Sequence, residues 1–313
     1  MSVNDFVSYR DHLVKACSKA IVGKEEEINL IAVCYLCGGH ILLEDVPGTG
    51  KTMLFRAFSK AVGGSFKRIQ FTPDVMPSDV TGINFYNMKN GEFEFRPGPI
   101  FADMVLADEI NRATPRTQSS LLEAMAEGQV SVDGVTHRLG AAFMVAATQN
   151  PIESFGTFPL PEAQMDRFMM RLKLGYMSRN DEISVALRRD TNDIIAELPQ
   201  VVTEEETLKL RSELDSVEIS DVVMGYVMDI IEKTRNDSRF NIGASPRGTI
   251  ALCKGARAYA AFRGSSFVTP DDIKTLAPYI LAHRLYYRTA VSSSESEELF
   301  SQMLNEIDVP TEA

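Results

Sequence analysis

Short apolar runs alternate with longer amphipathic stretches through the first 175 residues. Runs at 41–43, 66–71, 104–107, 143–147 and 169–174 are typical of buried strands. The stretches at 5–20, 25–38 and 114–127 carry apolar residues at helical spacing. Because strands and helices alternate, the pattern predicts a parallel sheet with helices on both faces.

Two hairpins interrupt this alternation. The first pairs 83–86 with 92–95 around Asn90-Gly91, and the second pairs 129–132 with 135–138 around Asp133-Gly134. Both are predicted as insertions outside the central sheet. They bracket the apolar run 104–107, and we therefore expect them to have a function rather than to be decorative loops.

The strand pattern fades after about residue 175. Helical spacing continues at 180–195, 203–214, 219–235, 246–263 and 270–287, with prolines between several of these stretches. We therefore expect a core domain over 1–198 and a smaller, all-helical domain over 199–313.

The stretch 42–52 reads Leu-Leu-Glu-Asp-Val-Pro-Gly-Thr-Gly-Lys-Thr, a strand that breaks into a glycine-rich loop and opens a helix. Backbone N–H groups of such a loop cradle phosphates, Lys51 would reach them, and the Thr52 hydroxyl would bind Mg²⁺. Asp45 stands where the general pattern has glycine. We expect it to be tolerated because Asp adopts left-handed backbone conformations readily.

Two carboxylates end the apolar run 104–107. Parallel strands place such a pair at the carboxyl edge of the sheet, beside the phosphate loop. Asp108 is predicted to organise Mg²⁺, and Glu109 to act as general base or to orient the attacking water. Asn150 ends the next strand, and its amide would help to position that water.

Four arginines are candidates for contact with the transferred phosphoryl group. Arg167 is predicted to be an arginine finger acting on a neighbouring subunit, and Arg171 is a weaker candidate for this role. Arg112 follows the two carboxylates closely enough to share it. Arg247 begins a helix of the second domain and is predicted to reach the γ-phosphate when that domain closes.

Composition limits the range of functions. The chain has 313 residues, a formal net charge of −11 and a sequence pI of about 5.0. This acidity argues against a strong nucleic-acid or anionic membrane surface. No secretory signal or apolar run of about 20 residues is visible, so we expect a cytoplasmic protein without a membrane span. Four cysteines without a second metal-spaced pair are predicted to be structural thiols.

Together these motifs resemble the AAA+ ATPases, and most closely the MoxR family, from about residue 22 to 285. The matching segments are 42–52, Asp-Glu-Ile-Asn-Arg at 108–112, Leu-Pro-Glu-Ala-Gln-Met-Asp-Arg-Phe at 160–168, and Gly-Ala-Ser-Pro-Arg at 243–247. The resemblance implies an αβα ATPase domain with a helical lid.

The same resemblance implies roles for residues. Lys51 and Thr52 would be Walker A, Asp108 and Glu109 Walker B, Asn150 sensor 1, Arg167 the arginine finger and Arg247 sensor 2. The implied nucleotide-binding set is Val22, Gly23, Asp45, Val46, Pro47, Gly48, Thr49, Gly50, Lys51, Thr52 and Met53, with Val22 and Gly23 at the adenine.

The resemblance also implies a biological setting. The ligands would be ATP and Mg²⁺, and the assembly an ATP-promoted homo-hexamer. The role would be that of a chaperone-like remodeller of a client protein, with a von Willebrand factor A-type partner. Alternatives are a DNA-directed motor, a non-hydrolysing nucleotide switch, and the motor subunit of a metal chelatase.

Overall fold

The computed structural model describes residues 3–46, 48–149, 156–188, 190–289 and 291–310. Its centre is a five-stranded sheet in the order β2-β5-β8-β1-β9, with all strands parallel. The strands are β1 (Ile41–Glu44), β2 (Phe66–Gln70), β5 (Met104–Asp108), β8 (Met144–Gln149) and β9 (Met170–Leu172). The predicted parallel sheet is confirmed, and its strands lie within the predicted runs or within two residues of their ends.

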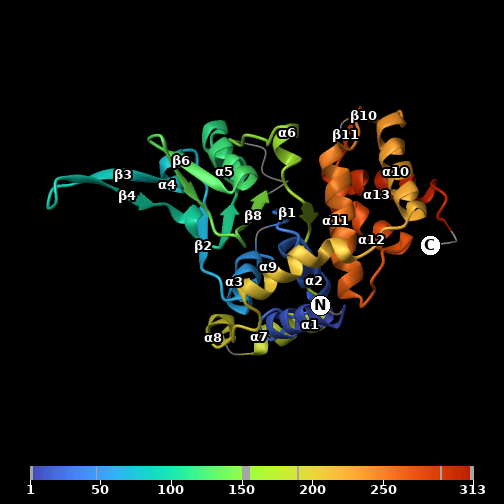
Figure 1. Cartoon of the computed structure of the whole chain (residues 1–313), viewed down its shortest axis with the longest axis horizontal. Coiled ribbons are helices and arrows are strands. Elements are labelled where there is room, and N and C mark those ends of the chain that lie inside the picture. Colours follow the sequence, from blue (N-terminus) through green and yellow to red (C-terminus); the bar gives the residue numbers. More distant parts are fainter. Residues whose placement is uncertain (1–2, 47, 150–155, 189, 290, 311–313) are drawn as a thin grey trace.

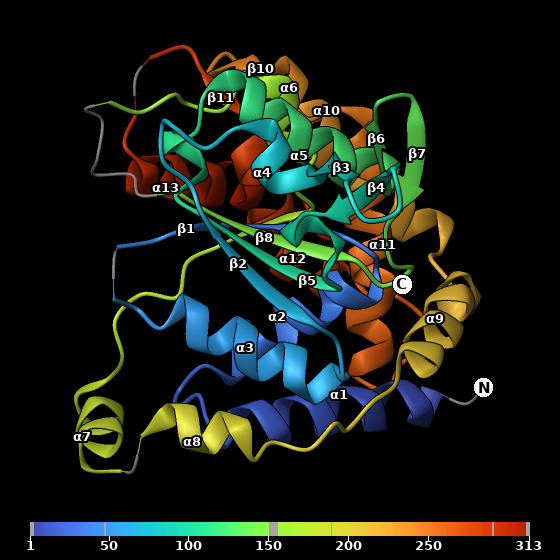
Figure 2. The ribbon, with the colours of Figure 1, turned by 90° about the vertical axis from the view of Figure 1, so that its left-hand side faces the viewer.

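Helices cover both faces of the sheet (Figure 2). One face carries α1 (Val3–Ser18), α2 (Glu25–Leu36) and α3 (Lys51–Val62), and the other carries α4 (Pro77–Thr81) and α5 (Pro115–Glu127). Successive strand residues point to opposite faces. Leu106 accordingly packs with the first group, whereas Val105 and Ala107 pack with the second.

Both predicted hairpins are present. They are β3 (Gly82–Asn87) with β4 (Glu92–Pro97), and β6 (Gln129–Val132) with β7 (Val135–Arg138). The β3–β4 hairpin projects far from the body of the molecule (Figure 1). The two hairpins are joined by a hydrogen bond of 2.9 Å from Asn84 Nδ2 to Asp133 Oδ2, and His137 stacks on Phe95.

The remaining chain is mainly helical but differs from the prediction in three details. The stretch 180–195 forms two helices, and the stretch 270–287 is helical only to Leu281. A short strand, β11 (Tyr286–Tyr287), follows and pairs with β10 (Phe240–Ile242). The second domain is therefore not all-helical, in contrast to the prediction, since it contains this short ladder. The local pattern did not indicate the ladder because it joins segments far apart in sequence. The helices are α7 (Arg179–Leu187), α8 (Thr191–Ala196), α9 (Glu204–Glu213), α10 (Asp221–Asn236), α11 (Pro246–Phe262), α12 (Pro270–Leu281) and α13 (Ser293–Asn305).

The C-terminal helices share a continuous apolar core with the sheet domain. Helix α11 packs on α1 and α2, and α12 packs on β9. The boundary between residues 198 and 199 stays a prediction. Cys17, Cys34 and Cys37 are buried free thiols, as predicted, and burial raises the pKa of Cys17 and Cys37 to about 12. Within the described ranges no helix is long and apolar enough to cross a membrane.

Candidate active site at the carboxyl edge of the sheet

The phosphate-loop segment connects the end of β1 to the first turn of α3. Gly48 and Gly50 both have φ near +87°, a left-handed conformation that glycine adopts at little cost. The Lys51 ammonium donates to the carbonyls of Asp45 at 3.2 Å and Val46 at 2.8 Å, so it lies over the loop. No acidic residue stands in the first turn of α3, which leaves its positive end available to an anion. Pro47 lies outside the described residues.

Asp45 anchors this loop through its side chain. The carboxylate is buried and accepts hydrogen bonds from the backbone N–H of Val46 at 2.9 Å and of Leu174 and Gly175 at 3.1 Å each. Its φ is not positive, so the predicted reason for tolerating aspartate here is wrong. The acid instead ties the loop to the segment after β9.

Asp108 ends β5 and is held by two neighbouring strands. The Thr148 hydroxyl on β8 donates to its Oδ1 at 2.6 Å, and the Arg68 guanidinium on β2 donates to its Oδ2 at 2.6 and 3.0 Å. These contacts follow from the strand order, because β5 lies between β2 and β8. Neither Arg68 nor Thr148 was among the predicted site residues.

Glu109 follows in a left-handed conformation, with φ 57° and ψ 48°. This conformation costs a non-glycine residue roughly 1–2 kcal/mol, and such strain clusters at functional sites. Its N–H donates to Thr148 Oγ1 at 2.8 Å, and its Oε2 accepts from Gln70 Nε2 at 2.8 Å. Arg112 pairs with the same oxygen at 3.2 Å.

A cavity of about 360 Å³ lies between the loop and the two acids. It is lined by Asp45, Gly48, Thr49, Gly50, Lys51, Thr52, Met53, Arg68, Gln70, Asp108, Glu109, Thr148 and Gln149. Among the described residues no group of three or more His, Cys, Asp or Glu could hold a metal alone. A hydroxyl and one carboxylate, Thr52 and Asp108, suit Mg²⁺, which is usually bound by few protein oxygens together with phosphate oxygens. Asn150 lies outside the described residues.

A second, more apolar cavity of about 210 Å³ shares Gly48, Thr49 and Gly50 with the first. Its lining includes Val22 and Met53, together with residues of α7 and α8 and the segment before α7. Gly23 has φ +65°, and a Cβ there would lie 2.5 Å from an Asp181 carboxylate oxygen. Together the two cavities can hold a ligand that has an anionic group at one end and an apolar ring at the other.

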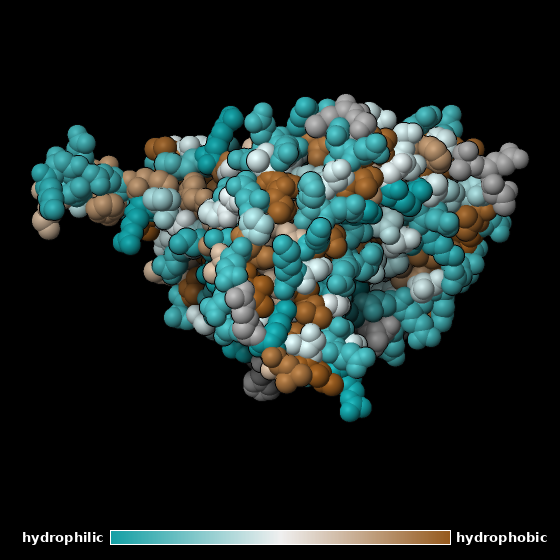
Figure 3. Space-filling view, turned by 90° about the horizontal axis from the view of Figure 1, so that it is seen from below, coloured by the Kyte–Doolittle hydropathy of each residue, from teal (hydrophilic) through white to brown (hydrophobic). Residues whose placement is uncertain are grey.

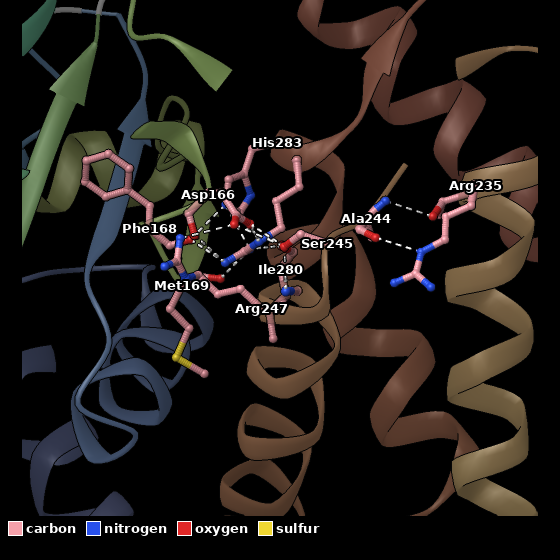
Figure 4. Close-up of polar contacts among 12 residues, drawn as sticks. Asp166, Phe168, Met169, Arg235, Ala244, Ser245, Arg247, Ile280 and His283 are labelled. Atoms are coloured by element: carbon pink, nitrogen blue, oxygen red, sulfur yellow. Dashed lines mark hydrogen bonds and ion pairs between the residues drawn. The ribbon is translucent and has the colours of Figure 1, made fainter. Parts of the chain in front are cut away.

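The structure places Arg167 and Arg247 beside Asp166, away from this cavity. Arg167 follows Asp166 in the sequence, and Arg247 Nη1 pairs with the Asp166 carboxylate at 3.3 Å (Figure 4). The Arg167 guanidinium donates to the carbonyl of Leu122 on α5. Neither arginine lines the phosphate cavity. The α11–α12 part of the second domain therefore does not bring Arg247 to the phosphate loop of its own chain.

Arg171 and Arg112 are differently placed. Arg171 is mostly buried and pairs with Glu44 at 3.2 Å and Glu297 at 3.7 Å, so its charge joins β9 to β1 and α13. Arg112 is half-exposed and lies against Glu109 of its own site. Both are thus paired with acids of their own chain, whereas Arg167 donates to a backbone carbonyl.

Two family models match the chain. "ATPase family associated with various cellular activities (AAA)" covers residues 40–170, and "AAA lid domain" covers residues 232–303. The chain is 36% identical to "Chaperone MoxR1" of Mycobacterium tuberculosis, over 93% of this chain and 80% of the relative. It belongs to the MoxR family of AAA+ ATPases. Protein MoxR of Paracoccus denitrificans is 32% identical over 88% of each chain.

Further comparisons agree with this membership. "Uncharacterized protein YeaC" of Bacillus subtilis is 47% identical over 96% of this chain and 94% of the relative. The crystal structure of a proposed ATPase from Cytophaga hutchinsonii superposes with a TM-score of 0.89 at 36% identity, over 98% of each chain. The predicted AAA+ fold with a C-terminal lid is confirmed.

Proposed function

We propose that this MoxR-family protein is a Mg²⁺-dependent ATP hydrolase. One observation supports this above the others: Glu109 stands at the cavity edge in a strained left-handed conformation, held by Thr148 and Gln70. A carboxylate fixed beside a phosphate loop can accept the proton of an attacking water. Lys51 would bind the β- and γ-phosphates, while Thr52 and Asp108 would hold Mg²⁺, which neutralises charge on the phosphates when bound.

We infer that Arg167 and Arg247 act on the nucleotide of a neighbouring subunit. Arg167 and Arg247 both belong to the Asp166 neighbourhood, outside the phosphate cavity of their own chain. This favours a ring in which both reach the nucleotide of the next protomer, rather than a cis role for Arg247 on lid closure. Asn150, which follows β8 in the sequence, is proposed to orient the water.

We propose that the ring is a cytoplasmic homo-hexamer that remodels a client protein, with a von Willebrand factor A-type partner. The β3–β4 hairpin supports a protein client. Met88 and Phe93 are 89% and 75% exposed on it, and the hairpin stands clear of the body (Figure 3). An exposed, projecting hairpin with apolar side chains can contact a client protein directly. A net charge of −11 disfavours DNA as the client.

One observation keeps a second candidate in view. A magnesium-chelatase ChlI homologue of Methanocaldococcus jannaschii is 27% identical over 70% of this chain. A chelatase motor subunit would use the same ATP site with a different partner. Co-purification with a chelatase catalytic subunit would favour this alternative over a general remodeller.

The test is steady-state ATPase activity against protein concentration, with and without Mg²⁺, beside light scattering. The proposal predicts Mg²⁺-dependent turnover whose specific activity rises as ATP assembles the ring. Lys51→Ala should abolish nucleotide binding and turnover. Tight ATP binding with no turnover at any concentration, in the presence of Mg²⁺, would contradict hydrolysis and leave a nucleotide switch.

A further inference from the structure

Arg284 is a buried arginine at the end of η4 (Ala282–Arg284), in the second domain. Its side chain is 2% exposed, and its Nε donates to Asp166 Oδ1 at 2.8 Å. Nη2 donates to the carbonyls of Phe168 at 2.8 Å and Asp166 at 3.3 Å, and Nη1 donates to those of Met169 and Ile280. All five N–H donors are therefore used.

Three of these carbonyls surround one residue of the proposed trans site. Asp166 and Phe168 immediately flank Arg167, and Met169 follows, so the guanidinium of Arg284 fixes the backbone on both sides of Arg167. A planar five-donor group can do this, whereas an ammonium cannot reach several carbonyls in one plane.

Asp166 extends the same network to Arg247. Its carboxylate accepts from the Ser245 hydroxyl, at 3.0 Å to each oxygen, and from Arg247 Nη1 at 3.3 Å. Ser245 also caps α11 by accepting from the N–H of Gly248 at 3.3 Å. Asp166 is thus the point where the segment bearing Arg167 meets the helix start bearing Arg247 (Figure 4).

The far side of this helix start is held as well. Arg235 Nε donates to the Ala244 carbonyl at 3.0 Å (Figure 4). The Ala244 N–H donates to Thr234 Oγ1 at 3.0 Å. A Cβ on Gly243 would lie 2.6 Å from the Thr234 carbonyl oxygen, so this close approach requires glycine. The segment before Arg247 is therefore fixed from both sides.

We propose that Arg284 is a positioning residue which, through Asp166, holds Arg167 and Arg247 as one rigid two-arginine unit facing the neighbouring subunit. The inference rests on the proposed trans action of these arginines. It adds that their relative placement is set by a buried residue that lies outside the phosphate cavity of its own chain. The core segment that bears Arg167 and the helix start that bears Arg247 would then keep a fixed placement relative to each other.

The first test measures turnover and nucleotide affinity separately. Arg284→Met keeps an unbranched apolar stem but removes every donor, and Arg284→Lys keeps the charge for the case in which Arg284→Met does not fold. Since a misplacement of about 1 Å can cost 10²-fold, we expect kcat to fall by roughly 10- to 100-fold. The Kd for ATP should change by less than about twofold, because the cavity is untouched.

Arg211 provides a matched control. It too is an arginine whose guanidinium bridges backbone carbonyls, donating to Tyr35, Leu36 and Ala141 at 2.9–3.0 Å, but it contacts neither Asp166 nor the arginine pair. Arg211→Met should lower stability without the selective loss of kcat. An equal loss of kcat in both variants would assign the effect to general destabilisation and overturn the inference.

Subunit mixing provides the decisive readout. A subunit with Arg284→Met or Arg284→Lys keeps its own phosphate loop, and a Lys51→Ala subunit keeps its arginine pair. Mixed rings should therefore recover turnover at interfaces that combine the two intact halves. A structural role confined to the subunit's own ATP site predicts no recovery.

Mixing Arg167→Ala, in place of the Arg284 variant, with Lys51→Ala distinguishes failure of the positioning role from failure of the trans site. If Arg167→Ala recovers activity with Lys51→Ala but the Arg284 variants do not, the positioning role is wrong and the trans site stands. If neither recovers, the trans site itself is wrong. Wild-type kcat in both Arg284 variants also overturns the inference.

Discussion

The Thr148 hydroxyl binds both acids of the candidate site at once: it donates to Asp108 Oδ1 at 2.6 Å and accepts from the Glu109 N–H at 2.8 Å. One side chain from β8 thereby fixes the carboxylate of the proposed metal ligand and the strained backbone of the proposed base. Since Thr148 is buried, removing this hydroxyl leaves both groups without that partner.

Thr148→Val should therefore lower kcat by roughly 10- to 100-fold, because both acids lose their positions. The loss of buried hydrogen bonds should cost about 1–3 kcal/mol of unfolding free energy. Thr207→Val is the matched control, since Thr207 is also buried and bonds to Tyr9 Oη and the Thr203 carbonyl, remote from the site. Equal kcat values for the two variants would contradict the positioning role of Thr148.

Glu109→Gln should bind ATP with unchanged affinity and lose turnover by about 10²–10⁴-fold, the usual contribution of a general base. The amide keeps the size of the side chain but cannot accept the proton of water. Equilibrium binding of a fluorescent ATP analogue, beside steady-state hydrolysis, separates the two effects. Turnover close to that of the wild type would remove Glu109 from the mechanism.

Arg68→Ala should reduce the Mg²⁺ concentration needed for half-maximal activity. The guanidinium occupies Asp108 Oδ2 and competes with a cation for it. Because Arg68 is 46% exposed, the pair is worth about 1 kcal/mol or less, which corresponds to a shift of up to about fivefold. Arg257→Ala, which breaks the exposed pair with Asp215, serves as the control. A higher Mg²⁺ requirement would instead indicate that Arg68 binds the nucleotide phosphates.

Acid should destabilise the fold below about pH 6.5. Burial lowers the pKa of His40 to about 4 and that of His283 well below its usual value. The unfolded state, with pKa about 6.5, therefore binds protons that the folded state does not, and stability falls as pH falls. Each histidine should cost about 1.4 kcal/mol between pH 7.5 and 5.5.

Urea unfolding at these two pH values measures the effect. His40→Gln can preserve the hydrogen bonds that His40 makes to the Met125 carbonyl and from the Val145 N–H, while it removes one titrating group. The pH-dependent loss should then fall by about half. An identical loss in the variant and the wild type would show that His40 does not contribute.

Much of the fold was predictable because local patterns determine it. Apolar runs gave the five strands, and Asn90-Gly91 and Asp133-Gly134 gave the two hairpins. The loop with Lys51 and the acids Asp108 and Glu109 met at one cavity, as the strand ends implied. These features depend on a few contiguous residues, which one sequence displays directly.

The rest depends on contacts between distant segments. Arg68, Gln70 and Thr148 enter the site only because β2 and β8 flank β5, an order that the sequence does not state. The ladder of β10 with β11 and the role of the Asp45 side chain likewise depend on residues far along the chain. The place of Arg247 depends on how the second domain packs on the core, which no local pattern indicates, and its predicted approach to the phosphate on domain closure stays a prediction.

The most direct test of the account mixes two inactive variants, Lys51→Ala and Arg167→Ala, and measures ATPase activity against their ratio. Each variant alone should be nearly inactive, because one lacks the phosphate ligand and the other the charge supplied to its neighbour. We predict that activity reappears in the mixture and is greatest near equal amounts, since only mixed interfaces combine both intact halves. A mixture that stays inactive, under conditions in which wild-type protein assembles and turns over, would contradict an ATP site shared between subunits.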